Sequence, residues 1–158
     1  MLIAIPTSSA SGQPIASHDS IEAMAGVGLS GDRCATGSGF YSGKSEWDAH
    51  VTLIQREPFD LLAAEHGVRL DPEELRRNLI TRGVNLAALV GREFRIGEQV
   101  VLRGRKPWPP CAHIVQLSGR IEIFKYLSKR CGIGADVLVG GTIRVGDSRV
   151  FPERLAAT

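Results

Sequence analysis

Short apolar segments, each ended by glycine or by a polar turn, are the feature that most limits how this chain can fold. The longest uninterrupted apolar runs have only a few residues, so they suit short buried strands. Strand-like segments outnumber helical ones and do not alternate regularly with them. This order favours a mainly β (α+β) fold, a strand-rich barrel or curled sheet with helical insertions, over a doubly wound fold.

The size and charge of the chain narrow the class of protein. A chain of 158 residues with 43% apolar residues predicts a single domain over residues 1–158 with a sizeable core. The net charge of +2 is too small to predict a nucleic-acid or membrane partner. No apolar run approaches the roughly 20 residues that span a bilayer. Three irregularly spaced cysteines do not form a disulfide framework, which predicts a reducing, cytoplasmic setting.

Several elements carry clear local signals. We expect a strand within residues 15–24 and a buried strand over Val51–Ile54. Pro58 and Gly67 mark the first turn and the C-terminal cap of a helix. The capping-box spacing after Asp71 predicts a short helical turn that runs to about Arg77.

The second half of the chain contains two glycine-centred strand patterns and one helical pattern. Residues 94–103 and 137–145 each predict a β-hairpin. Apolar residues at helical spacing over residues 120–131 predict a second helix that ends at Gly132. Residues 26–45 contain six glycines and little periodicity, so we expect a long loop of functional interest.

Cys111 stands in the most unusual local setting. Three prolines precede it in the segment Lys106-Pro107-Trp108-Pro109-Pro110-Cys111-Ala112-His113. They restrict the backbone, so neither a regular helix nor a central strand is expected there. The neighbouring basic residues favour a thiolate, the form that acts as nucleophile or metal ligand. An inert cysteine beneath a proline-rich turn is the competing interpretation.

The glycine-rich loop supplies two further candidates. Cys34 follows Gly31-Asp32-Arg33 and could pair with Cys111, although a loop cysteine is often incidental. The segment 38–45 ends in Gly43-Lys44-Ser45 but has Ser38 where a phosphate-binding loop needs glycine. Nucleotide hydrolysis is therefore rejected, and Lys44 is kept as a candidate anion contact.

Short motifs follow one another along the chain in a specific order. They are Gly28-Leu29-Ser30-Gly31-Asp32-Arg33, Val51-Thr52-Leu53-Ile54, Leu75-Arg76-Arg77-Asn78-Leu79, Leu89-Val90-Gly91, Pro110-Cys111 and Gly140-Gly141-Thr142-Ile143. Taken in this order, they resemble the MOSC family, named after the C-terminal domain of molybdenum cofactor sulfurases. The resemblance runs from about residue 15 to residue 151 and covers most of the chain.

The resemblance implies a MOSC-type β-barrel, similar to the β domain of pyruvate kinase, over residues 1–158. It implies that Cys111 is a molybdenum ligand or a persulfide carrier, and that Asp32, Arg77 and Asn78 surround a molybdenum cofactor (molybdopterin). An arginine can fork two hydrogen bonds to phosphate, and an amide can both donate and accept. Arg77 and Asn78 could instead only terminate the short helical turn, and Asp32 could only brace a turn after Gly31. Many stand-alone members have histidine where this chain has Cys34.

Two classes of function follow from the sequence. The first is a protein that binds molybdenum cofactor or carries sulfur through Cys111, and that could reduce N-hydroxylated compounds with a separate electron-transfer protein. Its expected partners are a molybdenum cofactor enzyme or a cysteine desulfurase, and pyridoxal phosphate enters only through that desulfurase. The alternatives are a non-catalytic barrel module with a structural Cys111, or a Cys34–Cys111 thiol redox protein.

Overall fold

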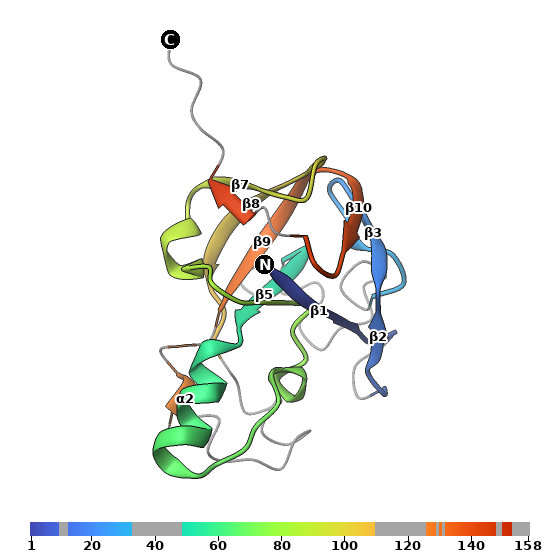
Figure 1. The fold of residues 1–158 in the computed structure, drawn as a ribbon. Coiled ribbons are helices and arrows are strands. Elements are labelled where there is room, and N and C mark those ends of the chain that lie inside the picture. The colour runs from blue at the N-terminus through green and yellow to red at the C-terminus, as the bar shows by residue number, and fades with distance from the viewer. Residues whose placement is uncertain are drawn as a thin grey trace.

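The protein folds into one curled sheet that is covered on its concave side by a second, smaller sheet (Figure 1). The computed structural model describes residues 1–9, 13–32, 49–109, 126–128, 130, 132–147 and 150–152, the last three by their backbone. The larger sheet has, in spatial order, β11 (Val150–Pro152), β7 (Glu93–Ile96), β8 (Val100–Pro107), β9 (Ile133–Val139), β5 (Val51–Gln55), β6 (Leu79–Thr81), β1 (Leu2–Thr7) and β2 (Ala16–His18). The smaller sheet has β10 (Gly141–Arg144), β3 (Ser20–Met24) and β4 (Gly28–Leu29). The mainly β architecture is as expected.

Helical structure is confined to short insertions between strands. The helix α2 (Glu57–His66) has proline in its first turn and ends at Gly67, whose φ of 66° is left-handed, so both of its predicted boundary signals are confirmed. Two 3₁₀ turns follow, η2 (Pro72–Leu75) and η3 (Leu86–Leu89). The turn η2 ends earlier than predicted because Arg76 adopts a left-handed φ of 56°.

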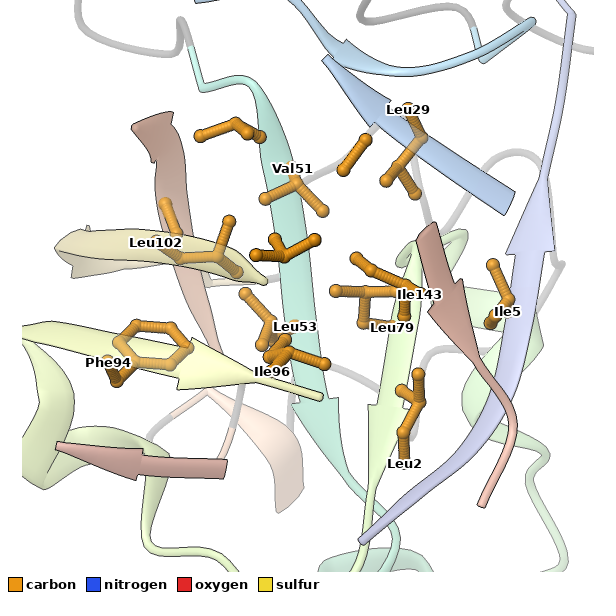
Figure 2. Close-up of a cluster of buried hydrophobic side chains, with 14 of the residues drawn as sticks. Leu2, Ile5, Leu29, Val51, Leu53, Leu79, Phe94, Ile96, Leu102 and Ile143 are labelled. Carbon is orange, nitrogen blue, oxygen red and sulfur yellow. The ribbon is translucent and has the colours of Figure 1, made fainter. Parts of the chain in front are cut away.

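The two faces of the larger sheet carry separate apolar clusters. Side chains alternate between the faces of a strand, so Val51 and Leu53 of β5 join one cluster and Ile54 joins the other. The first cluster fills the space between the two sheets, and its labelled members converge there in Figure 2. The second cluster lies beneath α2 and contains Ile54, Phe59, Leu62, Leu70, Leu75, Ile80 and Leu127.

The predicted hairpin over residues 137–145 is wrong. The strand β9 pairs with β5 and β8, whereas β10 pairs with β3 of the smaller sheet. The chain crosses between the sheets at Gly140, where a Cβ atom would lie 2.7 Å from the carbonyl oxygen of Ala23. This close approach explains why the residue is a glycine. Gly140 lies where the chain passes from one sheet to the other, and it does not form the tight turn of a hairpin.

The predicted buried strand over Val51–Ile54 is confirmed as β5. The predicted loop over residues 26–45 is wrong at Gly28–Leu29, which form β4, and its residues 33–45 lie outside the described residues. Residues 94–103 form the expected antiparallel pair of β7 and β8, although β8 continues to Pro107. Residues 15–24 form two strands, β2 and β3, where one was expected. Most of the predicted helix over residues 120–131 lies outside the described residues. No helix in the described part of the chain is long and apolar enough to cross a membrane.

Candidate functional site

A row of polar and small residues crosses three neighbouring strands on the α2 side of the larger sheet. Thr52 of β5 is in register with Gly134 of β9. The parallel β5–β6 pairing matches Leu53 with Leu79, which places Thr52 beside Asn78. Thr52 and Asn78 therefore occupy the same face as Ile54 and Ile80, at one end of the second apolar cluster.

The side-chain amide of Asn78 is fixed by Thr52. Its Oδ1 accepts the backbone N–H of Thr52 at 3.0 Å and the Thr52 hydroxyl at 3.1 Å. A backbone N–H can only donate, so the atom facing it must be the amide oxygen, and Nδ2 must point the other way. Asn78 is fully buried, and Nδ2 finds no hydrogen-bond acceptor among the described residues. A buried amide donor of this kind costs free energy unless it meets an acceptor.

Arg77 points its guanidinium group at the segment that leads to Cys111. Its side chain is 4% exposed, and Nη2 donates a 2.6 Å hydrogen bond to the carbonyl oxygen of Trp108. A charge-assisted hydrogen bond in a buried setting is among the stronger polar contacts. The left-handed backbone of Arg76 ends the η2 turn immediately before it. Arg77 and Asn78 therefore lie in the short connection between the end of η2 and the start of β6.

Trp108 is held at both ends of its backbone and at its ring. Its N–H donates to the carbonyl oxygen of Gly132 at 3.0 Å. The indole packs against Gly134, where a Cβ atom would lie 2.6 Å from the ring carbon Cε3. Lys106 lies with Nζ 5.5 Å from the ring centroid, a cation–π contact. Trp108 therefore covers the Gly134 end of the polar row.

Asp32 lies at the buried end of a series of hydrogen bonds that runs through Ser8 to Arg76. It is fully buried, and Oδ1 accepts the backbone N–H of Ser8 at 3.2 Å. The Ser8 hydroxyl accepts a 2.8 Å hydrogen bond from Nη2 of Arg76. Hydrogen bonds and one short stretch of backbone thus link Asp32 to Arg77 and Asn78.

The structure buries three of the predicted site residues, and hydrogen bonds through Ser8 and Arg76 connect them. Asp32, Arg77 and Asn78 are all buried, and burial is unusual for these residue types unless they are paired. Cys111, Lys44 and Cys34 lie outside the described residues. Within the described ranges, no three His, Cys, Asp or Glu side chains form a group that could hold a metal ion.

Sequence reasoning missed four residues of this arrangement. Thr52 lies inside an apolar strand pattern, and Trp108 lies in a proline-rich segment in which Cys111 is the candidate. Ser8 lies in a polar turn, and Arg76 lies inside the motif in which Arg77 and Asn78 are the candidates. A threonine within an otherwise apolar buried strand is a usable signal, because a buried hydroxyl needs a polar partner.

The fold and the buried polar row define a mainly β domain with an internal polar site beside a proline-rich segment. The chain matches the family model of the MOSC domain over residues 31–149, and it belongs to the MOSC domain family. This family is associated in general with the molybdenum cofactor. The search of curated proteins found no match.

Solved structures share the fold at low sequence identity. The YuaD protein of Bacillus subtilis superposes with a TM-score of 0.70 at 15% identity, over 92% of each chain. YiiM from Escherichia coli gives 0.64 at 18% identity, over 99% of this chain and 72% of that one. YiiM from Geobacillus stearothermophilus gives 0.64 at 15% identity, over 99% and 75%. These similarities establish the fold.

Proposed function

We propose that this domain binds a molybdenum cofactor, with the Cys111 thiolate as a ligand of the metal. The observation that carries the proposal is Nδ2 of Asn78, a fully buried amide donor with no acceptor in the described part of the chain. A pterin carbonyl or a phosphate oxygen is an acceptor that would satisfy it. A non-catalytic module with a structural Cys111 gives no reason for such a donor.

The described residues fit an anionic, acceptor-rich group. Arg77 brings a buried positive charge next to Asn78, and a guanidinium suits phosphate. Asp32 brings a buried carboxylate that can accept from pterin nitrogens. Lys44 is the further anion contact proposed from the glycine-rich loop. We assign these four residues to holding the cofactor.

Cys111 supplies the soft ligand in this proposal. A thiolate is the cysteine form that binds metals, and it suits a soft or redox-active centre. The bound cofactor would supply two-electron redox chemistry at molybdenum. The reaction class that we propose is reduction of an N-hydroxylated compound to the amine and water, which consumes two electrons and two protons. A separate electron-transfer protein provides the electrons.

The decisive experiment is purification of the full chain from a host that makes molybdenum cofactor, followed by metal analysis and intact mass. We expect near-stoichiometric molybdenum in the wild type and in Cys34→Ser, and its loss in Cys111→Ser. A protein without molybdenum that gains the mass of one sulfur atom at Cys111 from a cysteine desulfurase would be a persulfide carrier. Absence of both would support the non-catalytic binding module. A Cys34–Cys111 disulfide in the intact mass would support the redox protein.

A further inference from the structure

Arg76 lies between the two parts of the proposed cofactor site and is connected to both. Its backbone leads directly into Arg77 and Asn78. Its side chain contacts Ser8, whose backbone N–H donates to Asp32. We infer that Arg76 is a positioning residue, which holds the Asp32 carboxylate in a fixed relation to the Arg77–Asn78 pair. The inference rests on the proposed function for the ligand that these residues hold, and on the contacts of Arg76 for the rest.

The backbone of Arg76 is held in a conformation that favours glycine. Its φ of 56° and ψ of 37° lie in the left-handed region. Among the residues that the structure describes, every other position with a positive φ is occupied by glycine. A glycine here would turn the chain in the same way with less steric cost. The presence of arginine therefore indicates that the side chain is needed, and strained positions of this kind often serve a functional site.

The side chain of Arg76 takes part in a triangle of hydrogen bonds. Nη2 donates to the hydroxyl oxygen of Ser8 at 2.8 Å and also to the carbonyl oxygen of Gln13. The Ser8 hydroxyl donates to that same carbonyl oxygen at 3.1 Å. Ser8 directly follows β1, and Gln13 precedes β2, so the guanidinium group joins both ends of the connection between these strands. Hydrogen bonds from a charged donor are stronger than neutral ones, which suits a fastening role.

Ser8 transmits this contact to Asp32. Its hydroxyl contacts Arg76, while its backbone N–H donates to Oδ1 of Asp32 at 3.2 Å. Both Ser8 and Asp32 are buried, and a buried carboxylate depends on its hydrogen-bond donors. Because one residue carries both contacts, a displaced hydroxyl displaces the amide as well. Loss of the Arg76 side chain should therefore weaken the hydrogen bond between Ser8 and Asp32.

Four variants separate the side chain of Arg76 from its backbone and from its charge. Arg76→Gly accepts the left-handed φ, so the turn can persist while both hydrogen bonds of the guanidinium are lost. Ser8→Ala removes the acceptor from the other side and keeps the backbone N–H. Arg76→Lys retains a cationic donor on a long side chain and should rescue the loss. Arg82→Gln, at an arginine that is about half exposed and follows β6, is the matched control for a lost charge.

The first measurement is amide hydrogen exchange by NMR on the full chain, and it needs no cofactor. The N–H of residue 8 reports the bond to Asp32, and the N–H of Thr52 reports the separate bond to Asn78. We expect Arg76→Gly and Ser8→Ala to speed exchange at residue 8 roughly tenfold, the effect of about one lost hydrogen bond, and to leave Thr52 at the wild-type rate. Arg76→Lys and Arg82→Gln should stay near the wild type. An unchanged rate at residue 8 in Arg76→Gly, or an equal rise at Thr52, would overturn the inference.

The second measurement is the molybdenum that each variant retains after dialysis, with protein from a host that makes the cofactor. We expect a roughly tenfold loss in Arg76→Gly and in Ser8→Ala, and rescue in Arg76→Lys. Faster exchange at residue 8 with wild-type molybdenum content would overturn the positioning role. A wild type without molybdenum would instead contradict the proposed function, and the positioning role would fall with it. Should Arg76→Gly fail to fold, Ser8→Ala carries both measurements, because it leaves the backbone of Arg76 unchanged.

Discussion

Thr52 donates two hydrogen bonds, from its backbone N–H and from its hydroxyl, to the same amide oxygen of Asn78. The hydroxyl in turn accepts the backbone N–H of Asn78 at 3.2 Å. This reciprocal contact determines which end of the amide faces the site, and it ties the end of η2 to the centre of the sheet. The orientation of Asn78 is thus a property of the fold and exists before any ligand binds.

Thr52→Val should destabilise the protein by about 1–2 kcal/mol. The change preserves shape but removes a buried hydroxyl that donates to Oδ1 and accepts from the Asn78 N–H. Thr81→Val is the matched control, because Thr81 is equally buried and its hydroxyl makes one long contact of 3.5 Å to the carbonyl oxygen of Ile54. Urea unfolding measures the free energy of unfolding of both variants, provided that their m-values are equal to that of the wild type. Equal losses in the two variants would contradict the role given to Thr52.

Gly132→Ala should cost about 3 kcal/mol or more. At this position φ is +80°, and a Cβ atom would lie 1.9 Å from the carbonyl oxygen of Leu53, which is backbone and cannot swing away. Gly67→Ala separates the left-handed backbone from the steric clash, because φ is +66° at Gly67 but no atom lies within 4 Å of the added Cβ. We expect only about 1 kcal/mol there, the cost of a left-handed alanine. Thermal or urea unfolding measures both variants. Similar losses of unfolding free energy in the two would argue against the clash as the cause.

Asp60 makes a pH-dependent contribution to stability. Hydrogen bonds first from Arg56 and then from Arg82 hold its pKa below the ordinary value of 3.8. A carboxyl whose pKa is lowered by folding stabilises the protein above its unfolded pKa, and the contribution is lost as pH falls through the folded pKa. The carboxylate is 44% exposed, so Asp60→Asn should cost only a few tenths of a kcal/mol at about pH 7.

The difference between wild type and Asp60→Asn should disappear in acid and shrink in high salt. Urea unfolding across that pH range measures it. Glu65→Gln, at an exposed acid of the same helix, is the control for removal of one carboxylate charge from α2. A destabilisation by Asp60→Asn that persists below the folded pKa would show that the ion pairs are not its cause.

The elements that the sequence predicts well are those with local causes. The helix α2 follows from Pro58 at its start and Gly67 at its end, and β5 follows from a continuous apolar run. The crossover at Gly140 depends on a backbone contact with Ala23, over a hundred residues earlier, and no local pattern signals it. A pair of glycines between two strand-like runs looks the same in a hairpin and in a crossover.

The candidate site also has residues that the sequence predicts and residues that only the fold identifies. Asp32, Arg77 and Asn78 could be named from motifs, because their identities and order are visible in the sequence. Their partners could not, since the pairing of Thr52 with Asn78 depends on the parallel register of β5 and β6. The contact of Arg77 with the Trp108 carbonyl likewise joins segments that have no local relation.

The molybdenum content of Asn78→Asp tests the central claim most directly. The carboxylate keeps an acceptor for both Thr52 donors, removes the Nδ2 donor and adds a negative charge, so the fold should survive while an anionic cofactor is repelled. Asn85→Asp, at an exposed position, is the control. With protein from a cofactor-producing host, we predict near-stoichiometric molybdenum in wild type and Asn85→Asp and at least roughly tenfold less in folded Asn78→Asp. Wild-type molybdenum content in Asn78→Asp would contradict the account.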